Sequence, residues 1–273
     1  MKIQVGHSPD ADDAFMFYAL AHEKLDTGDL EFQHILRDIE TLNRWALEQT
    51  LEVTALSVHA YAHVANDYAL LRHGASIGEK YGPIVVARDR FTIQELNRKR
   101  IAIPGELTTA FLALSLCVGK FEYEVVSFDQ IFAAVETGKV DAGLIIHEGQ
   151  LTYSDLGFIK ILDLGEWWYE KTSLPLPLGV NGVRKNLGPQ ICARISDLMQ
   201  RSIDYGLEHR AEAMQYAMKY ARNTEQSLTD RFVVMYVNHF TRDLGDQGTK
   251  AIHRLLKDAH AAGLIPATQI EII

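Results

Sequence analysis

The sequence has little cysteine, no excess of positive charge and no long apolar run. It contains two cysteines in 273 residues and carries a formal net charge of −9 at pH 7. Cys117 and Cys192 form no CxxC pair, and Cys117 lies in an apolar run, so we interpret it as a buried free thiol. Because an acidic chain repels phosphate backbones, we expect no nucleic-acid partner.

Signals for membranes and nucleotides are also missing. No stretch approaches the roughly 18 uninterrupted apolar residues that a membrane span needs. Asp10, Asp12 and Asp13 interrupt any signal-peptide core near the start of the chain, so we expect a soluble, cytoplasmic protein without a membrane partner. Neither GxxxxGKS/T nor GxGxxG occurs, and the sequence therefore gives no support for a nucleotide cofactor.

What is present is a regular alternation of β-like runs and helical patterns over the first 150 residues. Strands are expected over Lys2–His7, Leu30–Leu36, Glu52–Ser57, Pro83–Arg88, Arg100–Pro104, Tyr123–Ser127 and Asp141–His147. Such alternation indicates a parallel sheet with helices on its faces. From Pro189 onward the chain is almost entirely helical in pattern, and Leu174–Gly179, rich in proline, is predicted to cross between two lobes.

Polar residues follow several of these strands. In open α/β sheets, ligands bind at the carboxyl ends of the strands. The ends carry His7-Ser8-Pro9-Asp10, Ser57, the segment Pro104–Thr109, and His147-Glu148-Gly149. We therefore expect a cleft that holds one small organic molecule.

His147 is the candidate catalytic residue. It ends the apolar run Leu144-Ile145-Ile146, so its ring is expected to leave the sheet and face the cleft. A neutral imidazole that titrates near pH 7 suits a general base, which contributes about 10²–10⁴-fold in rate. The alternative is a structural or solvated histidine.

Two other segments have two interpretations each. For Asp10, Asp12 and Asp13 we favour helix capping over substrate contact. No metal is expected there, because an EF-hand loop needs a glycine and a distant glutamate that are missing. Thr108 and its neighbour Thr109 precede a helix, where they either cap it or bind a ligand with the backbone N–H groups.

At these same segments the chain resembles the 1,4-dihydroxy-6-naphthoate synthase family of the futalosine route to menaquinone. The resemblance rests on the following segments in order: Ser8–Phe15, Ile103–Gly105 with Thr108–Ala110, Ile145–Gly149 and Leu174–Gly179. It extends from the first strand to about Gly188, with a helical tail of compatible length.

This resemblance implies a two-lobed periplasmic-binding-protein-like fold of the second type with a central cleft and a helical C-terminal region. The expected larger lobe is 1–83 plus 184–273, and the smaller lobe is 84–183. The implied reaction is a lyase cleavage of cyclic dehypoxanthine futalosine to 1,4-dihydroxy-6-naphthoate and dihydroxyacetone, without a metal or other cofactor. His147 would be the proton acceptor, and the substrate site would contain Ala55, Leu56, Ser57, Thr109 and Ala110.

Two alternatives share this fold. A solute-binding receptor would have the cleft but need no base, and it should carry an export signal. Chorismate dehydratase of the same pathway is the second alternative, from which the Ile-Ile-His-Glu-Gly segment ending at Gly149 points away by resemblance.

Overall fold

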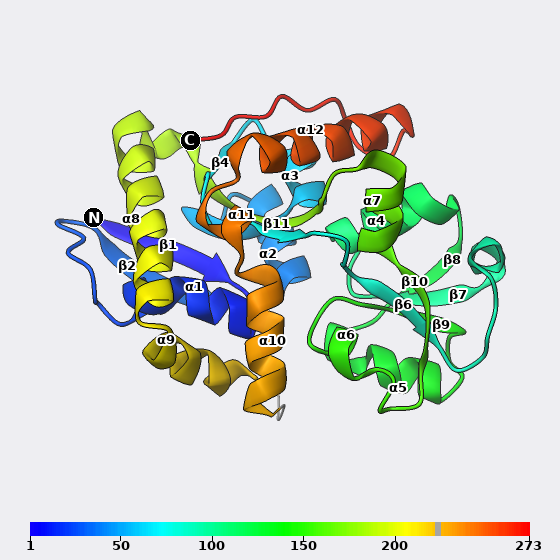
Figure 1. The fold of residues 1–273 in the computed structure, drawn as a ribbon. Coiled ribbons are helices and arrows are strands. Elements are labelled where there is room, and N and C mark those ends of the chain that lie inside the picture. Colours follow the sequence, from blue (N-terminus) through cyan, green and yellow to red (C-terminus); the bar gives the residue numbers. More distant parts are fainter. Residues whose placement is uncertain (222–224) are drawn as a thin grey trace.

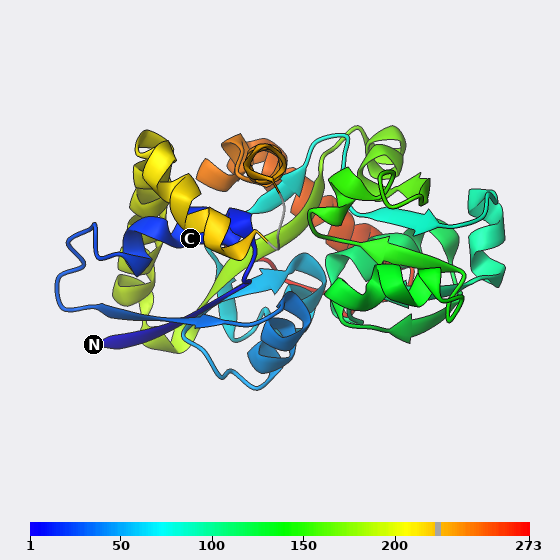
Figure 2. The ribbon, with the colours of Figure 1, turned by 90° about the horizontal axis from the view of Figure 1, so that it is seen from below.

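The protein, described here by a computed structural model that covers residues 1–221 and 225–273, consists of two α/β lobes lying side by side (Figures 1 and 2). Each lobe is built around its own β-sheet. We call the part around the six-stranded sheet the large lobe, and the part around the five-stranded sheet the small lobe. The boundaries of the two folding units stay a prediction.

The sheet of the large lobe consists of β1 (Lys2–His7), β2 (Glu31–Leu36), β3 (Val53–Ser57), β4 (Tyr68–Leu70), β5 (Ser76–Gly78) and β11 (Leu176–Arg184). Its order is β2-β1-β3-β11-β4, with β5 also paired to β11. β1 runs parallel to β2 and β3, whereas β11 runs antiparallel to β3, β4 and β5. β3 lies between β1 and β11 in this sheet, and every one of its residues is buried.

The sheet of the small lobe consists of β6 (Ile84–Ala87), β7 (Arg100–Ile103), β8 (Glu122–Val125), β9 (Ala142–Ile145) and β10 (Ile159–Asp163). Its order is β10-β6-β9-β7-β8. β7 runs parallel to β8 and β9, and β6 runs antiparallel to β9 and β10. Both sheets are therefore mixed.

Helices cover both sheets. Those of the large lobe are α1 (Ala11–Ala21), α2 (Ile39–Leu47), α3 (Val58–Val64), α8 (Pro189–Glu208), α9 (Arg210–Ala217), α10 (Gln226–Tyr236), α11 (His239–Arg242) and α12 (Gly245–Ala261). Those of the small lobe are α4 (Thr109–Val118), α5 (Ile131–Glu136), α6 (Gly149–Thr152) and α7 (Leu164–Thr172). Short 3₁₀ turns lie at Ile93–Arg98, Phe128–Gln130, Lys185–Leu187 and Met218–Tyr220. α12 contacts α3, α4 and β11, and Figure 1 shows it running across the top of the molecule over both lobes.

Apolar packing fixes the helices that border the cleft. α1 packs against α8, α9 and α10, and its Phe17 ring stacks on His7 of β1. Phe15, Met16 and Phe17 are each at most 1% exposed. At about 25 cal/mol per Å² of apolar area, three such side chains are a large stabilising term. The start of α1 is therefore held firmly at the carboxyl end of β1.

The expected strands are present within one or two residues, and the helical C-terminal third is confirmed. Two expectations are wrong. The sheets are not purely parallel, because β6 and β11 run against their neighbours. Leu174–Gly179 leads from α7 into the large-lobe sheet, as a crossover should, and Leu176 already begins β11. β9 ends at Ile145 rather than His147, so His147 lies in the turn before α6.

No helix in the described ranges is both long enough and apolar enough to cross a lipid bilayer.

Candidate active site

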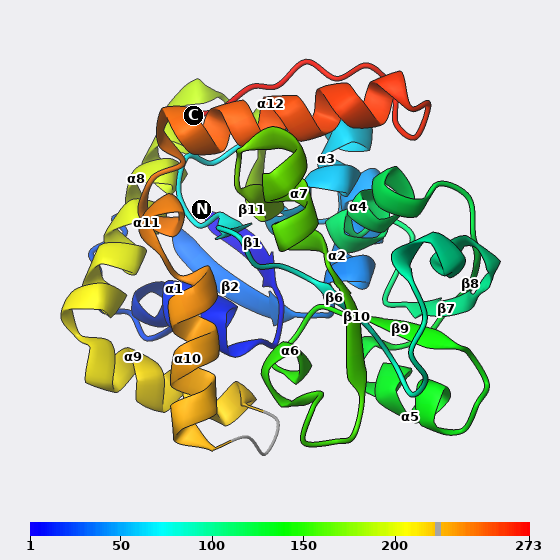
Figure 3. The ribbon, with the colours of Figure 1, turned by 45° about the vertical axis from the view of Figure 1, so that its right-hand side comes forward.

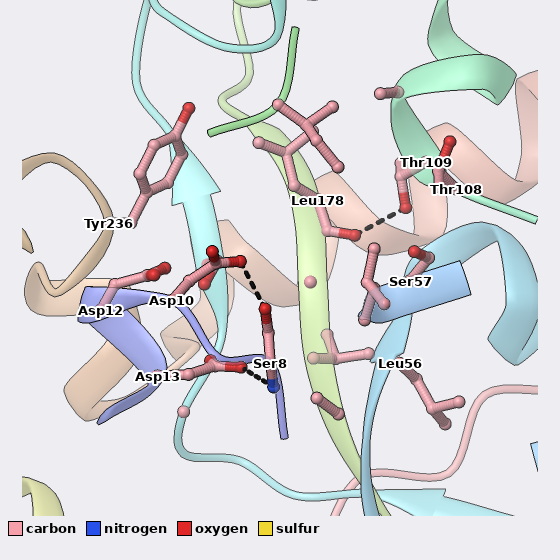
Figure 4. Close-up of a pocket in the computed structure, with 18 of the residues that line it drawn as sticks. Ser8, Asp10, Asp12, Asp13, Leu56, Ser57, Thr108, Thr109, Leu178 and Tyr236 are labelled. Atoms are coloured by element: carbon pink, nitrogen blue, oxygen red, sulfur yellow. Dashed lines mark hydrogen bonds between the residues drawn. The ribbon is translucent and has the colours of Figure 1, made fainter. Parts of the chain in front are cut away.

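A pocket lies between the two lobes (Figure 4). The large lobe contributes the loop after β1, the end of β3, part of β11 and the side of α10. The small lobe contributes Pro83, the start of α4 and Ile146. Together with its open mouth the pocket has a volume of about 760 Å³, which is within the usual range for small-molecule sites.

The structure brings all five residues predicted to bind substrate to this pocket. Ala55, Leu56, Ser57, Thr109 and Ala110 line it, although they come from two lobes and from positions more than 50 residues apart. Ser57 ends β3 and Thr109 begins α4, and Figure 4 shows the two on the same side of the pocket, opposite Asp12 and Tyr236. Contact with a substrate remains a prediction.

Asn43 of α2 holds Ser57 in place. Its Oδ1 accepts the Ser57 backbone N–H at 2.9 Å, and its Nδ2 donates to Ser57 Oγ at 3.0 Å. The same Nδ2 also donates to the carbonyl of Leu107 at 3.3 Å, just before α4. Asn43 is fully buried, and its hydrogen bonds tie the end of β3 to the small-lobe segment just before α4.

The two threonines at the start of α4 have different partners. Thr108 is the N-cap, and its Oγ1 accepts the N–H of Phe111 at 3.2 Å. Thr109 Oγ1 donates to the carbonyl of Leu178 in β11 at 2.6 Å and accepts the N–H of His59 at 3.3 Å. The capping interpretation of Thr108 is therefore confirmed, and Thr109 connects α4 to the central sheet strand.

The acidic loop after β1 forms one wall of the pocket. Asp10 is the N-cap residue of α1, but its side chain accepts no helix N–H, so the favoured capping interpretation is wrong for this side chain. Ser8 Oγ instead donates to Asp10 Oδ2, and the Ser8 backbone N–H donates to Asp13 Oδ2 at 2.7 Å. Asp10, Asp12 and Asp13 all line the pocket.

Burial and mutual repulsion perturb these carboxyls. Burial, together with the nearby Asp10 charge, raises the pKa of Asp13 to about 7. The pKa of Asp12 is raised well above its ordinary value, first by burial and then by the charges of Asp13, Asp10 and Glu148. No lysine, arginine or histidine is among the described residues that line the pocket. Part of this acidic wall therefore holds protons near neutral pH.

His147 does not join the pocket lining in this conformation, contrary to the expectation that its ring faces the cleft. Its ring makes edge contacts with Phe128 and Phe132 of its own lobe. The Gly149 N–H donates to Nδ1 at 3.1 Å, and Nε2 lies 3.2 Å from the Phe128 carbonyl. The reason is that β9 ends at Ile145, so His147 lies in the turn before α6, where its ring binds the Gly149 N–H.

The loop that carries His147 nevertheless adjoins the pocket. Ile146 lines it, and Glu148 is close enough to Asp12 to raise that residue's pKa. Gln150 accepts a hydrogen bond from the hydroxyl of Tyr236 at 2.8 Å, and Tyr236 lines the pocket from α10. In Figures 1 and 3, α6 of the small lobe and α10 of the large lobe are neighbours.

Tyr236 of the pocket lining, and Asn43 behind it, carry no local signal in the sequence. Asn43 is in the middle of a helix, and Tyr236 lies in the helical tail, far from every predicted site segment. Both reach the site only through tertiary packing. A buried asparagine on an amphipathic helix face is the one feature that could have drawn attention to Asn43.

Solved structures similar to this one define the class of protein. The alkanesulfonate-binding protein SsuA from Xanthomonas axonopodis covers 97% of this chain and 94% of its own, with a TM-score of 0.74 and 12% identity. A crystal structure of an Archaeoglobus fulgidus protein has a TM-score of 0.93 at 48% identity and covers 97% of this chain and 98% of its own. Fold and cleft thus define a periplasmic-binding-protein-like protein of two lobes.

Sequence relatives narrow this class. Residues 3–261 match the family model described as menaquinone biosynthesis. A Thermus thermophilus protein named 1,4-dihydroxy-6-naphthoate synthase is 42% identical over 262 residues, which is 96% of this chain and 95% of the relative. A Streptomyces coelicolor protein of the same name is 36% identical over 271 residues, covering 97% and 95%. The chain belongs to the menaquinone biosynthesis family, and the resemblance inferred from its motifs is confirmed.

Proposed function

We propose that this protein is a carbon–carbon lyase that cleaves cyclic dehypoxanthine futalosine into 1,4-dihydroxy-6-naphthoate and dihydroxyacetone. The observation that carries the proposal is the similarity, over nearly the whole chain, to two enzymes that share the name of this product. As part of the same proposal, the enzyme works in the cytoplasm on a small-molecule substrate.

In this proposal the substrate occupies the pocket between the lobes. Ser57 and the start of α4 bind it from the same side of the pocket, together with Ala55 and Leu56. The hydrogen bonds from Asn43 and to Leu178 hold the two hydroxyls in fixed positions before substrate arrives. Fixed partners lower the entropic cost of reaching a reactive arrangement.

His147 acts as the general base in this proposal. In the tautomer that its contacts favour, Nε2 carries the proton and Nδ1 carries the lone pair that accepts one. To reach substrate, the ring must give up its contacts with the Gly149 N–H and the Phe128 carbonyl. Each such hydrogen bond is worth only about 1 kcal/mol net, so substrate binding can drive the change. Catalytic contacts often tighten only in the substrate complex.

Turnover assays test the proposal. The purified protein is incubated separately with cyclic dehypoxanthine futalosine and with chorismate, and products are separated by chromatography. We expect 1,4-dihydroxy-6-naphthoate from the first incubation and no reaction with the second. Turnover of chorismate alone would assign the dehydratase activity, and turnover of neither compound would favour a binding protein.

The binding residues are tested by Ser57→Ala and Thr109→Val. Each variant removes one hydroxyl from the pocket and keeps the backbone, so KM should rise with a smaller change in kcat. If both variants leave KM unchanged, the substrate does not lie against these two elements.

A further inference from the structure

We propose that Asn181 of β11 binds the substrate, with its side-chain oxygen accepting a hydrogen bond from a substrate hydroxyl group. This inference rests on the proposed function, because it assigns a further recognition residue to the same pocket. Asn181 adds a buried hydrogen-bond acceptor to the hydroxyls of Ser57 and Thr109, and it is one of the residues that line the pocket.

Asn181 uses only one end of its side-chain amide. Its Nδ2 donates to the carbonyl of Gly74 at 2.9 Å. Its Oδ1 is buried and accepts a hydrogen bond from none of the residues that the structure describes. The amide cannot be turned by half a revolution, because two oxygens would then face each other. The side chain therefore presents an acceptor in a fixed orientation, and the residue is only 2% exposed.

Asn43 shows how a structural amide is paired in this protein. Its Oδ1 accepts from the Ser57 N–H, and its Nδ2 donates to Ser57 Oγ and to the Leu107 carbonyl, so both ends have partners inside the chain. Among the described residues of the pocket lining, only Asn181 has a buried side-chain N or O atom without a hydrogen-bond partner. Because nearly all buried polar atoms in folded proteins are paired, we infer that the donor to this oxygen enters with the ligand.

The pocket has room beside Asn181. Asn181 lies directly opposite Ala55 in the pairing of β11 with β3, so the two side chains are on the same face of the sheet. Gly179, two residues earlier in β11, belongs to that face as well. These three residues and Gly74 all line the pocket. One methyl group and two glycines fill little space, so a ligand in this part of the pocket can approach the amide oxygen.

A hydroxyl group is the substrate donor that this acceptor fits. The name of the relatives' product places two hydroxyls on a naphthoate ring, and dihydroxyacetone, the second product of the proposed reaction, carries two more. A carboxylate or carbonyl oxygen has no proton to donate and would be repelled by the amide oxygen. Asn181 should therefore favour hydroxyl-bearing ligands over analogues that lack the hydroxyl, because only the former pair its buried acceptor.

The test compares Kd values within two pairs of ligands, measured in direct binding titrations. The first pair is 1,4-dihydroxy-6-naphthoate and 2-naphthoate, which lacks the ring hydroxyls, and the second is dihydroxyacetone and acetone. The proteins are the wild type, Asn181→Ala, Asn181→Asp and the control Asn186→Ala, which changes an exposed asparagine outside the pocket lining. The ratio of the two Kd values in a pair isolates the hydroxyls, because a change in pocket shape or in stability affects both members.

The wild type should prefer the hydroxyl-bearing member of at least one pair. Asn181→Ala should reduce that preference by about 3- to 10-fold, the effect of one lost hydrogen bond. Asn181→Asp keeps an acceptor oxygen at this position and should retain the preference, as should the control. A loss in the first pair assigns the contact to the naphthalene ring, and a loss in the second assigns it to the three-carbon part. If Asn181→Ala fails to fold, as judged by its melting temperature, Asn181→Val, which suits a β-strand, replaces it.

Three results would overturn the inference. The first is a pair of Kd ratios that are the same in Asn181→Ala and the wild type, because the amide would then serve only the Gly74 carbonyl. The second is a wild type without any preference for hydroxyls, and the third is an Asn181→Asp protein that loses the preference as fully as Asn181→Ala. The titrations need no turnover. If the wild type fails to cleave the futalosine derivative but shows an Asn181-dependent preference for hydroxyls, the proposed function alone is refuted.

Discussion

Replacing Asn43 with leucine tests how the cleft is held together. The substitution keeps the approximate volume but removes two buried hydrogen bonds to Ser57 and one to the Leu107 carbonyl. It leaves the Ser57 N–H and the Leu107 carbonyl without their partner, at about 1–3 kcal/mol each, or roughly 2–6 kcal/mol in total. For a chain of this size each kcal/mol lowers Tm by about 2–4 °C, so a loss of about 3 kcal/mol corresponds to about 6–12 °C.

The assay combines thermal unfolding with steady-state kinetics on cyclic dehypoxanthine futalosine. Because Ser57 loses the groups that orient it, KM should rise in addition to the fall in Tm. The control is Asn97→Leu, a substitution of the same type at an exposed position. An Asn43→Leu protein with the melting temperature and the KM of the control would refute the role assigned to this side chain.

Two further predictions concern the junction of the lobes and the response to acid. Tyr236→Phe removes the hydroxyl that donates to Gln150 at 2.8 Å, so the free energy of unfolding, measured by denaturant titration, should fall by about 1–3 kcal/mol. An unchanged unfolding midpoint would contradict the buried contact. Burial, followed by the charge of His34, lowers the pKa of His7 to about 3. The pKa of an unfolded histidine is about 6.5. The stability that the neutral His7 ring contributes is therefore present above pH 6.5 and is lost as the pH falls toward 3. His7→Gln should therefore lose less stability than the wild type between pH 6.5 and pH 4, and equal slopes would show that His7 titrates normally.

Most of the secondary structure and part of the candidate site could be predicted from the sequence. Ser57 could be placed because a local pattern, a buried strand followed by a helix, puts it at a strand end. Thr108 could be recognised as a cap candidate for the same reason. Strand direction could not be predicted, because Leu176–Arg184 pairs antiparallel with β3 through contacts that span more than 100 residues.

The remaining site features depend on tertiary contacts. Asn43 meets Ser57 only after α2 packs beside β3, and Tyr236 reaches Gln150 only when the tail folds back across the opening. The orientation of His147 depends on the Gly149 N–H and on the carbonyl and ring of Phe128, which no spacing pattern reveals. The raised pKa of Asp12 arises from burial and from Glu148, which is 136 positions away in the chain.

The central claim, that an imidazole beside the cleft removes a proton from the substrate, is tested most directly by the kcat of His147→Ala with cyclic dehypoxanthine futalosine. The account predicts a fall of at least about 10²-fold, the low end for a lost general base, with a melting temperature close to that of the wild type. A kcat within a few-fold of the wild type in a folded variant would contradict the claim.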